Sequence, residues 1–577
     1  MTNKSTRFKE VPQDIKDIVG RIGDDHEDLL EVLTEMEDLP EGLSNKNISL
    51  ASLALGIPAN QAYGVKSFYS MLGTTPRENV LRVCDGPVCW MKRAMQGNDN
   101  SQEVINSIKK NVPDHWEVER SSCLGLCDQA PAILLNNEQA GPIAIEETAK
   151  ACQGWYGVPQ DYSVPRPEEV RVMLEQTGKL DPNDIQSAID AGGYSGLTEA
   201  LKHTPGEVIE IIEASGLQGR GGAGFPVGRK WRFVQQATQT PKYMIANADE
   251  SEPLIFKDRI LMDTNPHQLI EGITIGGYAC GASEGFIYIR GEYDKQASKL
   301  EHAIDQARER GWLGENIQDS GFTFDIHVHR GAGAYICGEE TALIESMEGK
   351  RGEPRLRPPY PPTYGFRGLP TAVNNVESYS AVPKIISKGS AWWKGISKYP
   401  IPGTKIYMVL GHIKKPGLFE APFGITMREI IEKFGGGLLE GSTFNFALTG
   451  GAAGTFVDAS KMDIPLDFSS SQKGISLGAG AFLICDQRVS PIALLRELLH
   501  FFAQESCGKC TPCRVGTWRA YELLKCMSSG DMSNENVNEL KAISRNLELA
   551  SFCGLGQSVS IPINSALSIF KTISSQR

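Results

Sequence analysis

The chain has 577 residues, which is too long for a single hydrophobic core and predicts about four domains. Its 58 basic and 70 acidic side chains give a net charge of −12, which disfavours nucleic acid or an anionic membrane surface as a partner. No apolar run approaches the ~18 residues of a membrane span, and the start of the chain has no apolar signal-peptide core, so we expect a cytoplasmic protein.

Residues 1–75 are predicted to form a helical bundle, because apolar residues from Ile15 to Met36 recur at intervals of three and four. A second domain is expected over residues 76–158. It carries two close pairs of thiols, and such pairs on turns are typical of a metal centre. The four cysteines are Cys84, Cys89, Cys123 and Cys127. Their spacing leaves zinc and [2Fe–2S] open, although the x4 and x3 loops favour the cluster over the C-x2-C hairpins of zinc.

A proline-bearing linker, residues 156–167, follows the second domain. We assign residues 159–215 to this linker and a set of short helices. The helices are predicted over residues 168–177, 184–191, 197–203 and 205–215.

A glycine-rich stretch, Gly219 to Phe225, opens the next domain, residues 216–398. Its glycines let backbone N–H groups approach an anion, and Arg220 and Lys230 supply positive charge for a phosphate. The fit to G-x-G-x-x-G is weak because a helix, not a strand, precedes it. The carboxylates Asp249, Glu250 and Glu252 are suited to ribose hydroxyls.

A second glycine run extends from Gly331 to Glu340. Strands and helices alternate between the two runs, which predicts a parallel sheet with helices on its faces. The cofactor should lie at the carboxyl ends of its strands. Two glycine runs together indicate two nucleotide ligands.

Residues 399–486 are rich in strands and glycine, and residues 487–577 are predicted to be helical. The last segment carries C-x2-C-x2-C at Cys507, Cys510 and Cys513, with Cys553 further on. Three thiols on one loop and one remote thiol are a strong [4Fe–4S] signature, with zinc a minor alternative.

From about residue 165 onward these motifs resemble the 51 kDa flavoprotein subunit of respiratory complex I, and residues up to about 158 resemble its 24 kDa subunit. The resemblance implies a multidomain α/β protein: an N-terminal helical bundle, a thioredoxin-like [2Fe–2S] domain, a Rossmann-like FMN and NADH domain, a β-grasp domain and a helical [4Fe–4S] bundle. Fusion of the two parts in one chain resembles the flavoprotein subunit of NAD-reducing [NiFe] hydrogenases.

The resemblance also implies ligand contacts. For FMN the expected residues, including the charged neighbours Arg220 and Glu250, are Gly219, Arg220, Gly221, Gly222, Lys230, Asn247, Asp249, Glu250, Tyr335, Gly338, Glu339, Glu340, Asn374 and Asn375. For NADH they are Phe225, Phe233, Glu252, Arg357 and Tyr360. Arg357, Tyr360 and Ser378 stand where the family pattern has Lys, Phe and Thr. No side chain is assigned a catalytic role, although Glu340 is expected near the flavin.

We therefore expect an NAD(H):acceptor oxidoreductase, or diaphorase. Hydride passes between NAD(H) and FMN, electrons leave singly through [4Fe–4S], and [2Fe–2S] is a side store. The chain has no site for the terminal substrate, so partner redox subunits are required. A NAD-reducing hydrogenase is the favoured partner. The alternatives are formate dehydrogenase, an electron-bifurcating complex, complex I, and a non-catalytic electron-relay subunit.

Overall fold

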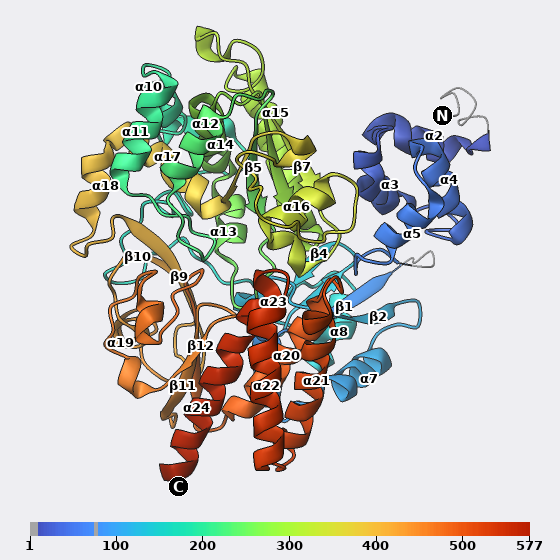
Figure 1. Ribbon diagram of the computed structural model, residues 1–577, viewed down its shortest axis with the longest axis vertical. Helices are drawn as coiled ribbons and strands as arrows, with labels where there is room; N and C mark the ends of the chain where they lie inside the picture. Colours follow the sequence, from blue (N-terminus) through green and yellow to red (C-terminus); the bar gives the residue numbers. More distant parts are fainter. Residues whose placement is uncertain (1–9, 74–78, 577) are drawn as a thin grey trace.

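The computed structural model describes residues 10–73 and 79–576. In the view of Figure 1 the N-terminal helices lie to one side of the molecule, and the C-terminal helices lie at its lower end. The first group comprises α2 (Gln13–Ile22), α3 (Leu29–Met36), α4 (Asn45–Leu55) and α5 (Ala59–Lys66). Their predicted apolar positions, Ile15 and Met36 among them, are buried. The predicted boundary between residues 75 and 76 lies outside the described residues.

The second domain is built on a four-stranded sheet of order β2-β1-β3-β4. Its strands are β1 (Val80–Cys84), β2 (Glu117–Ser121), β3 (Ile133–Leu135) and β4 (Glu138–Ala140). Its helices are α6 (Pro87–Ala94), α7 (Ser101–Asn111) and α8 (Thr148–Ala151). β1 pairs in parallel with β2 and antiparallel with β3. The first cysteine pair comprises the last residue of β1 and a residue of α6, and the second pair follows β2.

This domain is held against the large parallel sheet by buried polar contacts. Arg259 pairs with Asp128 at 2.5 Å, and Arg290 Nη2 donates to the carbonyl oxygen of Cys123 at 2.6 Å. Gly125 has φ +72°, and a Cβ atom there would lie 2.2 Å from the hydroxyl of Tyr293. Only glycine fits this approach.

The helix predicted over residues 168–177 is wrong, because this segment forms turns. The carboxylate of Glu420 accepts hydrogen bonds from the backbone N–H groups of Val172, Met173 and Leu174 at 2.8, 3.0 and 3.0 Å. These donors are thereby removed from any local helix. The helices that do form are α9 (Ile185–Asp190), α10 (Ser195–Ala200) and α11 (Pro205–Ser215).

The parallel sheet has the order β7-β6-β5-β8, and all its pairings are parallel, as predicted. The strands are β5 (Tyr243–Ala248), β6 (Glu284–Ile289), β7 (Asp325–Arg330) and β8 (Thr371–Asn375). The accompanying helices are α12 (Val227–Gln236), α13 (Lys257–Thr264), α14 (Pro266–Cys280), α15 (Asp294–Glu309), α16 (Glu340–Met347), α17 (Val376–Lys388) and α18 (Ser390–Ile396). Both glycine runs and the Asn247–Glu252 segment therefore meet at one edge of this sheet.

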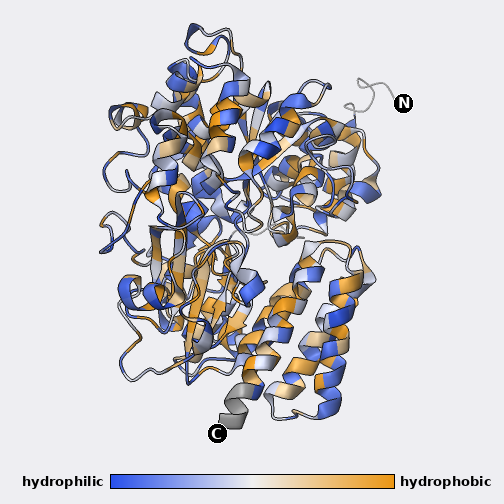
Figure 2. Cartoon of the chain, turned by 60° about the vertical axis from the view of Figure 1, so that its left-hand side comes forward, coloured by the Kyte–Doolittle hydropathy of each residue, from blue (hydrophilic) through white to orange (hydrophobic). Residues whose placement is uncertain are grey.

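A second, mixed sheet of order β10-β9-β13-β11-β12 follows. Its elements are β9 (Thr404–Gly411), β10 (Gly417–Pro422), α19 (Met427–Glu429), β11 (Phe444–Thr449), β12 (Thr455–Val457) and β13 (Ala481–Asp486). The C-terminal helices are α20 (Pro491–Glu505), α21 (Thr511–Ser528), α22 (Asn534–Ala550), α23 (Gly554–Ser558) and α24 (Ser560–Gln576). They show distinct apolar and polar faces (Figure 2).

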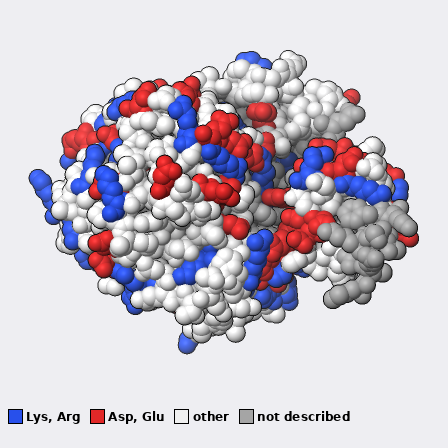
Figure 3. All heavy atoms as spheres, turned by 90° about the horizontal axis from the view of Figure 1, so that it is seen from above, with Lys and Arg blue, Asp and Glu red and all other residues white. Residues whose placement is uncertain are grey.

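Acidic and basic side chains are interspersed on the face seen in Figure 3. None of the helices within residues 10–73 and 79–576 combines the length and the apolar character needed to cross a bilayer.

Candidate functional site

A cavity of about 860 Å³ lies at the carboxyl ends of β5 and β8. This volume is within the range of ~300–1,000 Å³ that is usual for ligand pockets. The residues that line it are Gly219, Gly221, Ala223, Gly224, Phe225, Lys230, Phe233, Gln236, Ala237, Asn247, Gly338, Glu339, Glu340, Arg357, Tyr360, Pro362, Thr363, Val373, Asn374, Asn375, Ser378 and Gly554. Both predicted glycine runs thus border one cavity.

One wall consists of the first glycine run and the start of α17. Asn375 caps this helix by accepting from the N–H of Glu377 at 3.1 Å, and the N–H of Arg220 donates to Ser378 Oγ at 2.9 Å. A Cβ atom on Gly221 would lie 3.4 Å from Cβ of Asn375, so the loop backbone runs close to the helix start. The N–H groups of a helix N-terminus beside a glycine loop are suited to an anion.

The opposite wall is formed by the second glycine run and α16. Asn247 Nδ2 donates to the carbonyl oxygen of Gly338 at 2.8 Å. Glu340 pairs with Lys230 at 3.2 Å and with Arg357 at 3.2 Å. Glu339 caps α16. One wall of the cavity is therefore suited to bind an anion, and the opposite wall carries carboxylates.

Two aromatic rings stand at the solvent side of the cavity. Phe225 and Phe233 are each 42% exposed, which is high for phenylalanine. The guanidinium of Arg229 lies over both, 6.0 Å and 5.6 Å from the ring centroids. Tyr360 is exposed as well. Exposed rings of this kind are suited to stacking on a planar ligand.

Several predicted contact residues are not part of the cavity lining. The side chain of Arg220 is fully buried and donates to the carbonyl oxygens of Gln218 and Thr404. Glu250 accepts from the N–H groups of Asp258 and Arg259 at the start of α13. Gly222, Asp249, Glu252 and Tyr335 also lie outside the lining, although Gly222 adjoins Gly221 in sequence and Asp249 lies close to Gly338.

Of the three carboxylates behind the second glycine run, Glu250 is buried, and Asp249 and Glu252 are partly buried. Burial raises the pKa of Asp249 to about 8, against the opposing effect of Arg290. Burial likewise raises the pKa of Glu250 to about 8 and that of Glu252 above its usual value. Glu252 accepts from the hydroxyl of Tyr335 at 2.5 Å and from the N–H of Ala453 at 3.1 Å.

The first thiol group is entirely buried. It comprises Cys84 at the end of β1, Cys89 in α6, and Cys123 and Cys127 in the loop after β2. The sulfur atoms of Cys123 and Cys127 are 3.4 Å apart. Hydrogen bonds from the Cys123 and Cys89 thiols lower the pKa of Cys84 well below its usual value. The structure thus brings all four predicted ligands together.

The second thiol group lies between α20 and α23. The pKa of Cys513 is raised to about 12, chiefly by burial and in part by Cys510, Cys553 and Cys507, so the four lie within electrostatic range of one another. Cys510 and Cys553 occupy the N-cap positions of α21 and α23. Helix N-termini stabilise negatively charged sulfur.

Among the residues that the structure describes, no three Cys, His, Asp or Glu side chains surround the position of a single metal ion.

Gly554 lines the large cavity but was not among the residues predicted from the sequence. It is the neighbour of Cys553. Also not predicted were Gln236, Ala237, Pro362, Thr363 and Val373. Gln236 and Ala237 follow Phe233 at the end of α12, so helical spacing from that ring was the available signal. Nothing local marked Gly554, because its role depends on how the C-terminal helices pack.

Family models match four segments of the chain. They are the thioredoxin-like [2Fe–2S] ferredoxin over residues 15–155, the Nuo51 FMN-binding domain over residues 212–384, the SLBB domain over residues 406–460, and the NADH-ubiquinone oxidoreductase-F iron-sulfur binding region over residues 493–576.

Individual proteins match longer stretches. An F-type component of NADH-quinone oxidoreductase from Rhizobium meliloti (strain 1021) is 42% identical, covering 69% of this chain and 96% of that protein. The HndC component of an NADP-reducing hydrogenase from Solidesulfovibrio fructosivorans is 43% identical, covering 70% of this chain and 82% of that protein. A chain in the crystal structure of NAD+-reducing [NiFe]-hydrogenase in the air-oxidized state matches with a TM-score of 0.80 and 30% identity, covering 94% of this chain and 92% of that chain.

Proposed function

Because this chain belongs to the family of F-type NADH-quinone oxidoreductase components, we propose that its large cavity holds FMN and admits NAD(H) beside it. The chain is an NADH:FMN diaphorase-type electron-transfer subunit with FMN, [2Fe–2S] and [4Fe–4S] domains. The particular residues that contact each ligand, the route of the electrons and the identity of the partner are our proposals.

The cavity fits FMN at both ends. Its phosphate suits the start of α17, where Asn375, Ser378 and the backbone of Gly219 and Gly221 form the wall. Asp249 Oδ2 is buried, has no hydrogen-bond partner within the described residues, and lies where a Cβ atom on Gly338 would be 3.4 Å away. A buried oxygen atom without a hydrogen-bond partner is suited to accept a hydrogen bond from a hydroxyl group of the ribityl chain.

We place NAD(H) at the mouth of the cavity, between the exposed rings of Phe225 and Phe233 and beside Arg357 and Tyr360. Arg357 is held by Glu340, so its position is fixed before the ligand enters. When bound, flavin takes a hydride from NADH and releases electrons one at a time. The chain's contribution is to stack the nicotinamide and exclude water.

The observation that carries this function is Gly554, which lines the cavity while its neighbour Cys553 belongs to the second thiol group. The proposed flavin and [4Fe–4S] sites are therefore adjacent, which supports exit through that cluster. The first thiol group does not contribute to the cavity lining, and Arg290 joins Cys123 of this group to Glu250 through their carbonyl oxygens. That position supports a side store.

We propose a NAD-reducing hydrogenase as the partner complex. The F-type and HndC relatives cover only about 70% of this chain, whereas the NAD+-reducing [NiFe]-hydrogenase chain matches 94% of it and is itself covered to 92%. The fused arrangement is thus shared with that chain. Redox subunits of a multi-subunit complex are supported more generally by both groups of relatives.

The isolated chain is expected to reduce artificial dyes with NADH but to show no reaction with hydrogen, formate or quinone. The described residues hold two thiol groups and one large cavity, and the sequence predicts no further site for those substrates. Dye reduction followed by absorbance tests this. Activity of the lone chain with any of the three substrates would contradict it, and nickel in the complex purified from its source would identify the hydrogenase partner.

Phe233→Ala is expected to raise KM for NADH about fivefold to a hundredfold, because loss of one stacked ring costs about 1–3 kcal/mol. FMN content should stay at the wild-type level, since the ring stands at the mouth of the cavity. Steady-state kinetics with a dye acceptor gives the result. Tyr63→Ala, which removes an exposed ring from the N-terminal helices, is the control. An unchanged KM would mean that Phe233 only packs against Arg229.

A further inference from the structure

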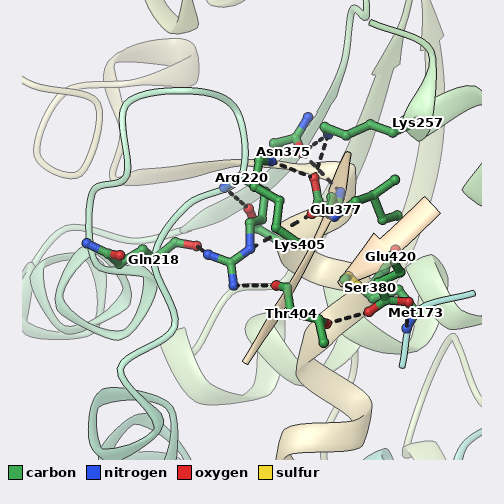
Figure 4. A network of polar contacts seen from close by, with 12 residues as sticks. Met173, Gln218, Arg220, Lys257, Asn375, Glu377, Ser380, Thr404, Lys405 and Glu420 are labelled. Atoms are coloured by element: carbon green, nitrogen blue, oxygen red, sulfur yellow. Dashed lines mark hydrogen bonds and ion pairs between the residues drawn. The ribbon is translucent and has the colours of Figure 1, made fainter. Parts of the chain in front are cut away.

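Three cationic side chains, Arg220, Lys257 and Lys405, surround the carboxylate of Glu377 (Figure 4). Glu377 Oε2 lies 3.1 Å from Lys257 Nζ and 3.3 Å from Lys405 Nζ, and Glu377 Oε1 lies 3.9 Å from Arg220 Nε. All four side chains are at most 1% exposed. We call this group the Glu377 cluster.

The cluster carries more positive than negative charge. Its second carboxylate is Asp258, which pairs with Lys257 at 2.6 Å, so three cations face two carboxylates. Arg220 Nε has no hydrogen-bond partner among the described residues. Two further carboxyl groups act on the cluster, Glu250 through Lys257 and Glu420 through Arg220. Burial raises the pKa values of these two carboxyl groups to about 8 and about 7, and burial lowers the pKa of Lys405 to about 8. At neutral pH both carboxyl groups are therefore partly protonated, whereas Lys405 remains mainly charged.

The cluster is joined to the residues that line the cavity. Lys257 Nζ donates to Asn375 Oδ1 at 2.9 Å, and Asn375 Nδ2 donates to Asp258 Oδ2 at 2.6 Å. Glu377 belongs to the first turn of α17, between the lining residues Asn375 and Ser378. The backbone of Arg220 belongs to the glycine run and is bonded to Ser378.

Excess positive charge that is withdrawn from water is unfavourable unless an anion lies nearby. Glu250 and Glu420 offset this positive charge only in part. The wall next to the cluster is the start of a 13-residue helix, whose N–H groups already favour an anion. The position of the missing negative charge is therefore the cavity itself.

We propose that the Glu377 cluster fixes the phosphate end of the flavin at the start of α17 by charge acting through the wall, without contact, and so makes the site select FMN over riboflavin. This rests on the proposed FMN site and names the residues that set its cofactor specificity. Arg220 contributes its charge from behind the wall, with its side chain turned away from the cavity.

Two substitutions separate charge from structure. Lys405→Gln and Glu377→Gln break the same ion pair, but the first lowers the net charge of the cluster by one and the second raises it by one. If the cluster acts by charge, the ratio of FMN to riboflavin affinity falls about tenfold to a hundredfold in Lys405→Gln and rises in Glu377→Gln. The double variant has the wild-type net charge and should return the ratio close to its wild-type value.

The measurement is titration of the full chain, freed of flavin, with FMN and with riboflavin, followed by quenching of flavin fluorescence. The ratio of the two affinities cancels any loss of structure that affects both ligands. If Lys405→Gln does not fold, Lys257→Gln carries the same test. A ratio that stays within about twofold in every variant, or that moves in one direction for both single variants, overturns the proposal. If the wild-type chain binds neither flavin, the FMN site itself is wrong.

Discussion

Cys510→Ser is expected to lower electron delivery to the partner complex more than about a hundredfold, while NADH still bleaches the bound flavin at close to the wild-type rate. In the proposed arrangement, hydride transfer takes place at the mouth of the cavity and does not require the cluster. Electron exit does require it, because Cys510, at the N-cap position of α21, belongs to the second thiol group, and Gly554 beside Cys553 of that group lines the cavity.

Stopped-flow absorbance of the flavin and steady-state turnover of the assembled complex give the two rates. Cys526→Ser is the matched control, because Cys526 is exposed further along α21 and belongs to neither thiol group. Equal loss of both rates in Cys510→Ser would mean that the cluster loop also shapes the flavin cavity through Gly554.

Cys84→Ser should lower steady-state turnover less than Cys510→Ser does if the cluster at the first thiol group is a side store.

Glu252→Gln is expected to raise the NADPH-to-NADH ratio of kcat/KM about fivefold to a hundredfold. An acidic side chain near the adenosine ribose accepts from its 2′-hydroxyl and repels a 2′-phosphate, and removing one charge in a partly solvated site relieves about 1–3 kcal/mol of repulsion. Membership of the family does not by itself decide between NADH and NADPH, because one relative is named as a component of an NADP-reducing hydrogenase.

The structure also shows a structural role for Glu252 that does not involve the ribose. Glu252 lies outside the cavity lining and accepts from Tyr335 and Ala453, so it also holds two loops together. Tyr335→Phe removes one of these hydrogen bonds but keeps the carboxylate, and should leave the NADPH-to-NADH ratio unchanged. If Glu252→Gln leaves the ratio at the wild-type value too, the ribose pocket lies elsewhere.

Local spacing predicts most of the helices and strands and both thiol groups. The alternation of strands and helices predicted the parallel sheet, because each element signals its own period. The strand order β7-β6-β5-β8 was not predicted, since it depends on crossovers between distant segments. The helix over residues 168–177 failed for a similar reason: the acceptor of its N–H groups is Glu420, in another domain.

Arg220 shows the same limit at the site. Its position in the glycine run predicted a phosphate contact, and its backbone does border the cavity through Ser378. The direction of its side chain depends on Thr404 and Glu377, which come from later parts of the chain. A sequence pattern can predict that a charged residue lies near a ligand. Whether its side chain contacts the ligand depends on residues elsewhere in the chain.

Buried contacts hold the [2Fe–2S] domain against the flavin domain, and they include Asp128 with Arg259 and Cys123 with Arg290. The covalent link between these domains affects how their association responds to dilution. Two separate polypeptides joined by such contacts dissociate as their concentration falls, and the first thiol group would then be lost from the flavin domain. Here residues 156–167 connect the two parts covalently, so the local concentration of one part around the other is set by the length of that connection, at about the millimolar level for short linkers. Occupancy of this interface should therefore be independent of how much protein the cell contains.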